Sequence, residues 1–348
     1  MHGLDESTTA GNYLSFARNQ ARGSSDTLAD WAEGVGEDAE VLALLNSLPV
    51  AKRQPNLLFG AARLVAGVDD LSVGVPYAEF RAAVLAQWES IRAEMLARST
   101  QTNEAGRCAT FLPLIASFDG PVALLEVGAS AGLCLYPDLY GYEYWVDGGE
   151  SVALAPVVGN SAVVNKCRIS SLSHVLRRLP EVAWRGGIDL NPLNPADPDT
   201  RSWLRALVWP EHAERRERLD AALAVARSHP VDMVKGSLVD EVEAVVSRIP
   251  HGLRVILFHS AVLAYLTESD RERFFDAVGR IQVVRPNTVW LSNEGPDVVR
   301  SVRERLTDEQ RAQVGGRFVM ALNGVPVALT GPHGESFEPL QTWVRGVA

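Results

Sequence analysis

The residues best suited to ligand binding or catalysis follow an apolar run, Val122–Val127. Glu126 lies within this run, and Gly128, Ser130 and Gly132 come after it, so an acid precedes three small residues at alternate positions. Glycine lets the backbone turn sharply and approach a ligand closely, and amides at the start of a following helix can face that ligand. Because a helical pattern follows, the segment predicts a turn at the end of a buried strand that binds a nucleotide-type ligand. Methyltransferases carry an acid and small residues in this arrangement.

The same letters also spell Gly-x-Ser-x-Gly, the nucleophile elbow of α/β-hydrolases, with Ser130 as the nucleophile. That interpretation needs several strands before the elbow, whereas the preceding 118 residues have helical patterns. Asp297 and His333 could complete a triad in the right chain order. The serine hydrolase therefore stays an alternative, and so does a tight turn without a ligand.

An acid at the end of the second strand would accept hydrogen bonds from the two ribose hydroxyls. Asp189 and Asp147 compete for this role, and we prefer Asp189 because it ends a cleaner strand. Either acid could instead cap a turn. Ser237 follows the third strand, where it would cap a helix and lie near the adenine edge.

Three residues are candidates for the acceptor side. His259 ends the fourth strand and could act as a general base, or it could be a packed histidine. Tyr265 follows in the next segment, and Glu294 follows the fifth strand. Glu294 could also be a solvated loop carboxylate.

The elements that would position these residues divide at about residue 118. Residues 1–118 show helical spacing and predict a helical domain that covers the cleft, and 119–348 alternate strands with helices. Such alternation predicts a mostly parallel sheet. Asn323 and Gly324 join two apolar runs and predict a hairpin that forms an antiparallel C-terminal edge. Residues 141–170 are expected to form an inserted hairpin.

Composition limits the partners. The net charge of -10 disfavours broad nucleic-acid binding, because the chain repels phosphates. The three cysteines form no CxxC pair, so we expect neither a metal site nor a disulfide. Residues 1–6 are polar and acidic, and no apolar run is long enough to span a membrane. We therefore expect a cytoplasmic protein.

The sequence resembles a bacterial, largely actinobacterial, family of unknown function, number 2332, over nearly its whole length. The resemblance implies a methyltransferase-like fold and no particular substrate. It also draws attention to a polar cluster before the first strand, in which Arg107 could pair with the carboxylate of a methionine moiety. Helix capping and a surface ion pair are the simpler explanations of this cluster. The segments that carry the resemblance are 101–107, which holds Asn103, Glu104 and Arg107, then 125–133, 187–193, 206–211 and 258–265.

Together these patterns predict an α/β protein with a Rossmann-like class I methyltransferase fold. Its sheet would have seven strands, mostly parallel, and S-adenosylmethionine (SAM) would be the cofactor. The reaction would be in-line methyl transfer to a small-molecule or protein acceptor. The alternatives are SAM-independent elimination or cyclisation on the same scaffold, and ligand binding without catalysis. The sequence leaves the oligomeric state open.

Overall fold

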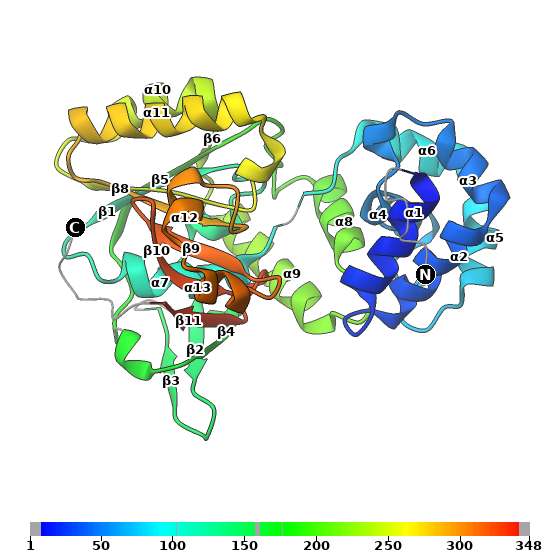
Figure 1. The fold of residues 1–348 in the computed structure, drawn as a ribbon, viewed down its shortest axis with the longest axis horizontal. Coiled ribbons are helices and arrows are strands. Elements are labelled where there is room, and N and C mark those ends of the chain that lie inside the picture. Colours follow the sequence, from blue (N-terminus) through cyan, green and yellow to red (C-terminus); the bar gives the residue numbers. More distant parts are fainter. Residues whose placement is uncertain (1–7, 102, 157–160, 176, 341–348) are drawn as a thin grey trace. The chain divides into compact units, whose positions relative to one another are not determined.

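The computed structural model describes residues 8–101, 103–156, 161–175 and 177–340 of the 348-residue chain. The described residues form an α/β protein with a large mixed sheet and many helices (Figure 1). They divide into two compact units, one holding residues 8–101 with Ala196–Asp220 and the other holding Asn103–Pro195 and the chain from Ala221 onward. Residues 1–6, on which the expectation about a signal segment depended, lie outside the described part.

The first unit is a helical assembly around an aromatic core. Trp31 stacks on Phe80 with ring centroids 4.4 Å apart, and Phe59 packs edge-on against both rings. The buried Arg63 donates to the carbonyls of Leu71, Ala206 and Val208. Its helices are α1 (Thr9–Phe16), α2 (Asp26–Glu37), α3 (Ala39–Asn46), α4 (Pro55–Ala66), α5 (Tyr77–Ala86), α6 (Trp88–Ala97), α8 (Pro198–Leu207) and the start of α9 (Ala213–Ser228).

This grouping differs from the division expected at residue 118. Helix α7 (Cys108–Ile115) belongs to the second unit, where the Phe111 ring packs on Phe258 with centroids 5.2 Å apart. Helix α8 belongs to the first unit, because its Trp203 lies in the aromatic core. Burial of these aromatic rings therefore decides the grouping, and position along the chain does not.

The second unit contains an 11-stranded sheet among the described residues, in the order β3-β2-β4-β11-β10-β9-β8-β7-β1-β5-β6. Five neighbouring strands, β6, β5, β1, β7 and β8, are parallel. The strands are β1 (Val122–Val127), β2 (Gly141–Trp145), β3 (Ser151–Leu154), β4 (Val164–Ile169), β5 (Val182–Asp189), β6 (Asp232–Lys235), β7 (Arg254–Ser260), β8 (Thr288–Glu294), β9 (Phe318–Leu322), β10 (Val325–Thr330) and β11 (Ser336–Pro339).

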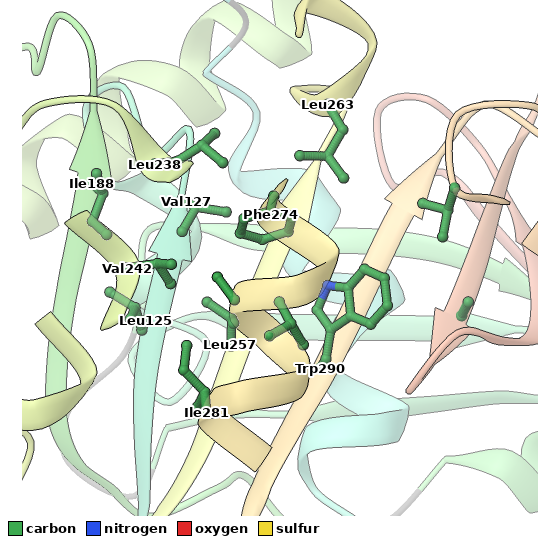
Figure 2. Packing of buried hydrophobic residues seen from close by; sticks show 14 of the residues in the cluster. Leu125, Val127, Ile188, Leu238, Val242, Leu257, Leu263, Phe274, Ile281 and Trp290 are labelled. Atoms are coloured by element: carbon green, nitrogen blue, oxygen red, sulfur yellow. The ribbon is translucent and has the colours of Figure 1, made fainter. Parts of the chain in front are cut away.

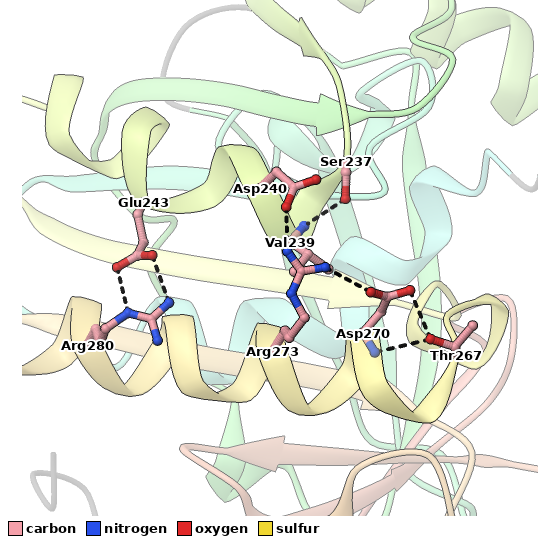
Figure 3. Close-up of polar contacts among 8 residues, drawn as sticks. All are labelled: Ser237, Val239, Asp240, Glu243, Thr267, Asp270, Arg273 and Arg280. Atoms are coloured by element: carbon pink, nitrogen blue, oxygen red, sulfur yellow. Dashed lines mark hydrogen bonds and ion pairs between the residues drawn. The ribbon is translucent and has the colours of Figure 1, made fainter.

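Helices α10 (Leu238–Arg248) and α11 (Glu268–Val284) cover one face of the parallel strands (Figure 1). Figure 2 shows their apolar side chains meeting those of β1, β7 and β8 in one core. Arg273 and Arg280 of α11 pair with Asp240 and Glu243 of α10 at 2.7 and 2.9 Å (Figure 3). These pairs are exposed, so packing contributes more to stability than they do. The remaining helices of this unit are α12 (Arg300–Arg305) and α13 (Asp308–Gln313).

The expected sheet of seven strands is wrong. The Asn323–Gly324 hairpin forms as predicted, with φ of 50° and 76°, but β9 and β10 lie inside the sheet and not at its edge. The reason is that β11 pairs with β10 and also with β4, which attaches the inserted segment to the sheet.

The insertion is also not the simple hairpin that was expected. Strand β2 pairs in parallel with β4, and the antiparallel partner of β2 is the short β3. The helix expected after the glycine turn is absent as well, because the described residues there form only a 3-10 turn, Leu133–Leu135. Pro137 follows this turn and, lacking an amide hydrogen, opposes its continuation as a helix.

Candidate functional site

The chain leaves β1 through a bend with left-handed backbone at three positions. Gly128 and Gly132 have φ of 72° and 70°, and Ser130 has φ of 52°. A residue with a side chain pays about 1 kcal/mol or more for this conformation, so its surroundings must hold it there. Asn103 does so, because its amide nitrogen donates to Ser130 Oγ at 2.8 Å while its oxygen accepts from Ala131 N at 2.8 Å.

All the amide N–H groups of this bend donate to acceptors within the protein. The expectation that they face a ligand is therefore wrong, because no helix follows and the acceptors come from the protein's own chain. The acceptors are Ile188 O for Gly128 and Ala129 (2.8 and 3.2 Å), Asp189 Oδ2 for Ser130 (2.8 Å), Asn103 Oδ1 for Ala131 (2.8 Å) and Ala129 O for Gly132 (2.7 Å).

The close approach that Gly128 permits is to a side chain of the protein. A Cβ built on Gly128 would lie 2.3 Å from Cγ2 of Val262, which follows β7. One side of the bend is thus filled by Val262, and any ligand lies beside the bend rather than inside it.

The two candidate ribose acids occupy different parts of the sheet. Asp189 ends β5, which neighbours β1, and its two oxygens accept from the amides of Ser130 and Asn191 at 2.8 and 2.7 Å. Asp147 follows β2, which lies beyond β10 and β11, and it pairs with Arg168 at 3.0 Å. Each carboxylate oxygen has two lone pairs, so Asp189 can still accept from a ligand. Of the two acids, only Asp189 lies next to the bend.

Glu126 is a buried acid at the end of β1, with 7% of its surface exposed. Its Oε2 has no hydrogen-bond partner among the described residues. Burial raises the pKa of Glu126 well above its usual value, and the nearby Cys134 thiol adds to this shift. Burial thus disfavours the charged form of this side chain, and its unused oxygen is an atom that a ligand donor could satisfy.

Glu104 and Arg107 lie in the segment that precedes α7. Glu104 Oε1 accepts from the Gly106 amide at 3.0 Å, and its Oε2 lies 3.8 Å from His333 Nδ1. Arg107 is 6% exposed and donates from Nε to Pro332 O at 2.8 Å and from Nη1 to Ser260 O at 3.3 Å. No carboxylate among the described residues lies within ion-pair distance of Arg107. The guanidinium thus keeps unused donors beside β7.

His259 is fully buried and lies in a polar chain of three residues. Trp290 Nε1 donates to His259 Nε2 at 3.0 Å, so the ring proton lies on Nδ1, which donates to Glu294 Oε1 at 2.8 Å. The same oxygen accepts from the amides of Val262 and Leu263. His259 therefore has no ring nitrogen available to a substrate, and with Glu294 it fixes the loop that carries Val262.

The alternation of side chains along the strands separates two polar groups. Val127, Leu257 and Trp290 belong to the core under α10 and α11, so His259 and Glu294 face those helices. Glu126 and Ser260 alternate with these core residues along β1 and β7. They therefore face the opposite side of the sheet, where Phe111 of α7 packs on Phe258. The candidate residues of β1 and β7 therefore lie on different faces of one sheet.

Three residues that the sequence did not single out form a chain of hydrogen bonds beside Arg107. Thr330 Oγ1 donates to Asn293 Oδ1 at 2.6 Å, and Asn293 Nδ2 donates to Ser260 Oγ at 3.1 Å. Thr330 and Asn293 are fully buried, whereas Ser260 is partly exposed. The only indication of this group in the sequence was a polar residue at the end of β7, and the neighbouring His259 was chosen there as the candidate.

The other candidates lie apart from this group. Ser237 caps α10, accepting from Val239 N at 3.3 Å (Figure 3). Tyr265 is 82% exposed. Asp297 pairs with Arg311 at 2.6 Å, so the hydrolase triad of Ser130, His333 and Asp297 is not assembled.

The residues that the structure describes lack two features that bear on function. No group of three or more His, Cys, Asp or Glu there is arranged to hold a metal ion. Within the same residues, every helix is too short or too polar to cross a membrane.

Comparison with models of known families gave a match. The family model described as "Uncharacterized protein conserved in bacteria (DUF2332)" matches residues 10–338. Neither the curated proteins nor the solved structures contain a match.

Proposed function

The chain belongs to the bacterial family DUF2332, and we propose that it is a SAM-dependent methyltransferase whose cofactor binds at the carboxyl ends of β1, β5 and β7. The strand order β6-β5-β1-β7-β8 carries this proposal, because β5 and β6 lie on one side of β1 whereas β7 and β8, which follow them in the chain, lie on the other. Ligands of doubly wound sheets bind where the order reverses in this way. Glu126 and Asp189 lie at the ends of β1 and β5, as the methyltransferase layout requires.

The proposal treats the parallel core as a class I methyltransferase fold with additions. Strands β9 and β10 would be its antiparallel pair, and β2, β3, β4 and β11 would extend the sheet beyond it. The stretch from β6 to β8 keeps the alternation of strand and helix, because β6, α10, β7, α11 and β8 follow one another along the chain, whereas α8 and α9 stand between β5 and β6.

Three side chains fit the polar groups of SAM. Glu126 has an unused Oε2 that could accept from the amino group, and Arg107 has unused donors for the carboxylate. Asp189 has lone pairs left for the ribose hydroxyls. The bend takes part through its shape and through Asp189, since its amides are already bonded.

The chain's own part in the reaction is to position and to exclude water. SAM supplies a sulfonium methyl group as the electrophile. Holding an acceptor in line with that group can account for about 7–11 kcal/mol of the barrier. The proposal assigns no base to His259, which has no available nitrogen, and leaves Tyr265 as an exposed candidate on the acceptor side. The acceptor would be a small molecule or a protein, and a cytoplasmic location remains our prediction.

Calorimetry with SAM and S-adenosylhomocysteine tests the proposal. The wild-type chain should bind both, and Asp189→Asn should weaken binding about tenfold or more, because one lone-pair set for the ribose is lost. Asp147→Asn is the matched control and should bind normally. Circular dichroism of both variants excludes misfolding. If the wild-type chain binds neither ligand, the methyltransferase proposal fails and SAM-independent chemistry or simple ligand binding replaces it.

The hydrolase alternative has its own test. Ser130 Oγ accepts from Asn103 Nδ2, and no histidine among the described residues is bonded to it. We therefore expect no labelling by a fluorophosphonate probe. Labelling that Ser130→Ala abolishes would instead favour a serine hydrolase.

A further inference from the structure

We propose that the Ser260 hydroxyl is a hydrogen-bond donor to a carboxylate that binds beside Arg107, at the carboxyl ends of β1 and β7. The inference deepens the proposed function and rests on it for the identity of the whole ligand. The carboxylate subsite itself depends only on the residues described below.

The hydrogen-bond chain behind Ser260 has a direction. The 2.6 Å contact from Thr330 Oγ1 to Asn293 Oδ1 has the length of an O–H···O bond, and the 3.1 Å contact from Asn293 to Ser260 suits N–H···O. The Asn293 amide is therefore oriented with its nitrogen toward Ser260. Because Ser260 Oγ accepts this bond, its own proton must point to another acceptor.

That proton has no acceptor among the described residues, and Ser260 is partly exposed. The backbone here is also fixed, because the Ala261 amide donates to Asn293 O at 3.0 Å. Ala261 has φ of 56°, a conformation that needs such support. Asn293 thus holds both the side chain and the following backbone of Ser260 in place.

Arg107 determines which kind of acceptor belongs there. Its Nη1 donates to the carbonyl of Ser260, so the guanidinium lies beside the residue that carries the hydroxyl. Glu126 lies close enough to interact electrostatically with Arg107, but no ion pair joins these two described side chains, and burial raises the pKa of Glu126 well above its usual value, which disfavours its charged form. A buried guanidinium without a counter-ion is costly, and a carboxylate offers two oxygens that suit the guanidinium and a hydroxyl.

The carboxylate could belong to the methionyl end of SAM or to a separate amino acid, and two probes distinguish these sources. S-adenosylhomocysteine carries the carboxylate, whereas 5′-methylthioadenosine carries the same nucleoside and thioether without it. Ser260→Ala should weaken the binding of S-adenosylhomocysteine about tenfold or more. The affinity for 5′-methylthioadenosine should stay within about twofold of the wild-type value. L-methionine, followed by saturation-transfer NMR, tests the subsite without a nucleoside.

Ser292→Ala is the matched control. Ser292 lies on the neighbouring strand β8, is 1% exposed, and its Oγ has no partner among the described residues. It lies outside the hydrogen-bond chain that ends at Ser260, so this variant should leave the affinity for every probe unchanged. Thr330→Val should weaken the binding of S-adenosylhomocysteine as Ser260→Ala does. Thr330→Ser should bind it as tightly as the wild type, because serine keeps the hydroxyl.

The outcomes separate the two proposals. If Ser260→Ala binds S-adenosylhomocysteine as tightly as the wild type, the subsite is refuted while the proposed function stands. If L-methionine binds and requires Ser260, but neither nucleoside binds, the subsite stands and the proposed function fails. If neither S-adenosylhomocysteine nor L-methionine shows binding that depends on Ser260, the inference is overturned.

Discussion

Replacement of Glu126 by glutamine should stabilise the sheet unit, and the gain should grow with pH. The side chain is 7% exposed, and burial raises its pKa well above the usual 4.5. Between these two pKa values the folded chain holds a proton that the unfolded chain has lost. Folding then becomes less favourable as pH rises, because the unfolded state binds fewer protons. Glutamine binds no proton in either state and is free of this penalty.

The size of the effect follows from proton linkage. Each pH unit between the unfolded and the folded pKa changes the difference in unfolding free energy by about 1.4 kcal/mol. The two chains should therefore be similar near pH 4.5 and should diverge steadily toward neutral pH. The unpartnered Oε2 becomes an amide nitrogen or oxygen, which reduces the gain by a roughly constant amount.

Native-state hydrogen exchange of β1 amides, measured from about pH 5 to about pH 8, would report this difference within the sheet unit. Glu143→Gln is the control, since Glu143 lies on β2 of the same sheet and is partly exposed. A difference between the wild-type and Glu126→Gln chains that stays flat across this range would refute the reasoning. It would mean that Glu126 is ionised in the folded chain and balances the charge of Arg107.

Three further changes test other contacts. Gly128→Ala should destabilise the sheet unit by about 1–3 kcal/mol, because its Cβ would lie 2.3 Å from Val262, and Val262→Ala should recover part of this loss in thermal melts. Trp290→Phe should cost about 1–3 kcal/mol in urea unfolding by leaving His259 Nε2 without its donor, with ligand affinity unchanged if His259 is structural. Arg63→Met should destabilise the helical unit by about 3 kcal/mol, since three carbonyls lose their donor, and a neutral result in the same assay would show that packing alone suffices.

The parallel strands could be predicted because each is a short apolar run bounded by turn residues, and Asn323 with Gly324 identified the hairpin. The 11-stranded sheet could not, since β11 is short and lies far from its partner β4 in the chain. Their pairing depends on tertiary contacts that a local pattern does not encode. The chain after Gly132 shows the same limit, because buried apolar residues at 133–135 suit a helix and a 3-10 turn equally well.

The site was predicted in part. Glu126 and Asp189 were identified from their positions at strand ends, and Asn103 and Arg107 from the family resemblance. The structure brings all four to the bend and the carboxyl ends of β1, β5 and β7. His259 was singled out as a candidate and the adjacent Ser260 was not, because a histidine can act as a general base and a serine alone rarely does. Two adjacent residues of a strand point to opposite faces of the sheet. The sequence did not show which face of β7 is covered by α7, and so it did not show whether His259 or Ser260 lies on that side.

The pairing of β4 with β11 affects how this protein is made. Arg168 and Ile169 meet Ser336 and Phe337, so the inserted segment joins the main sheet only through the last described strand. During synthesis the parallel strands can assemble before that strand leaves the ribosome, whereas β2, β3 and β4 must wait with an unpaired edge. A ribosome-bound chain that stops before Ser336 should therefore expose this segment to proteases while β1, β5 and β7 are already protected.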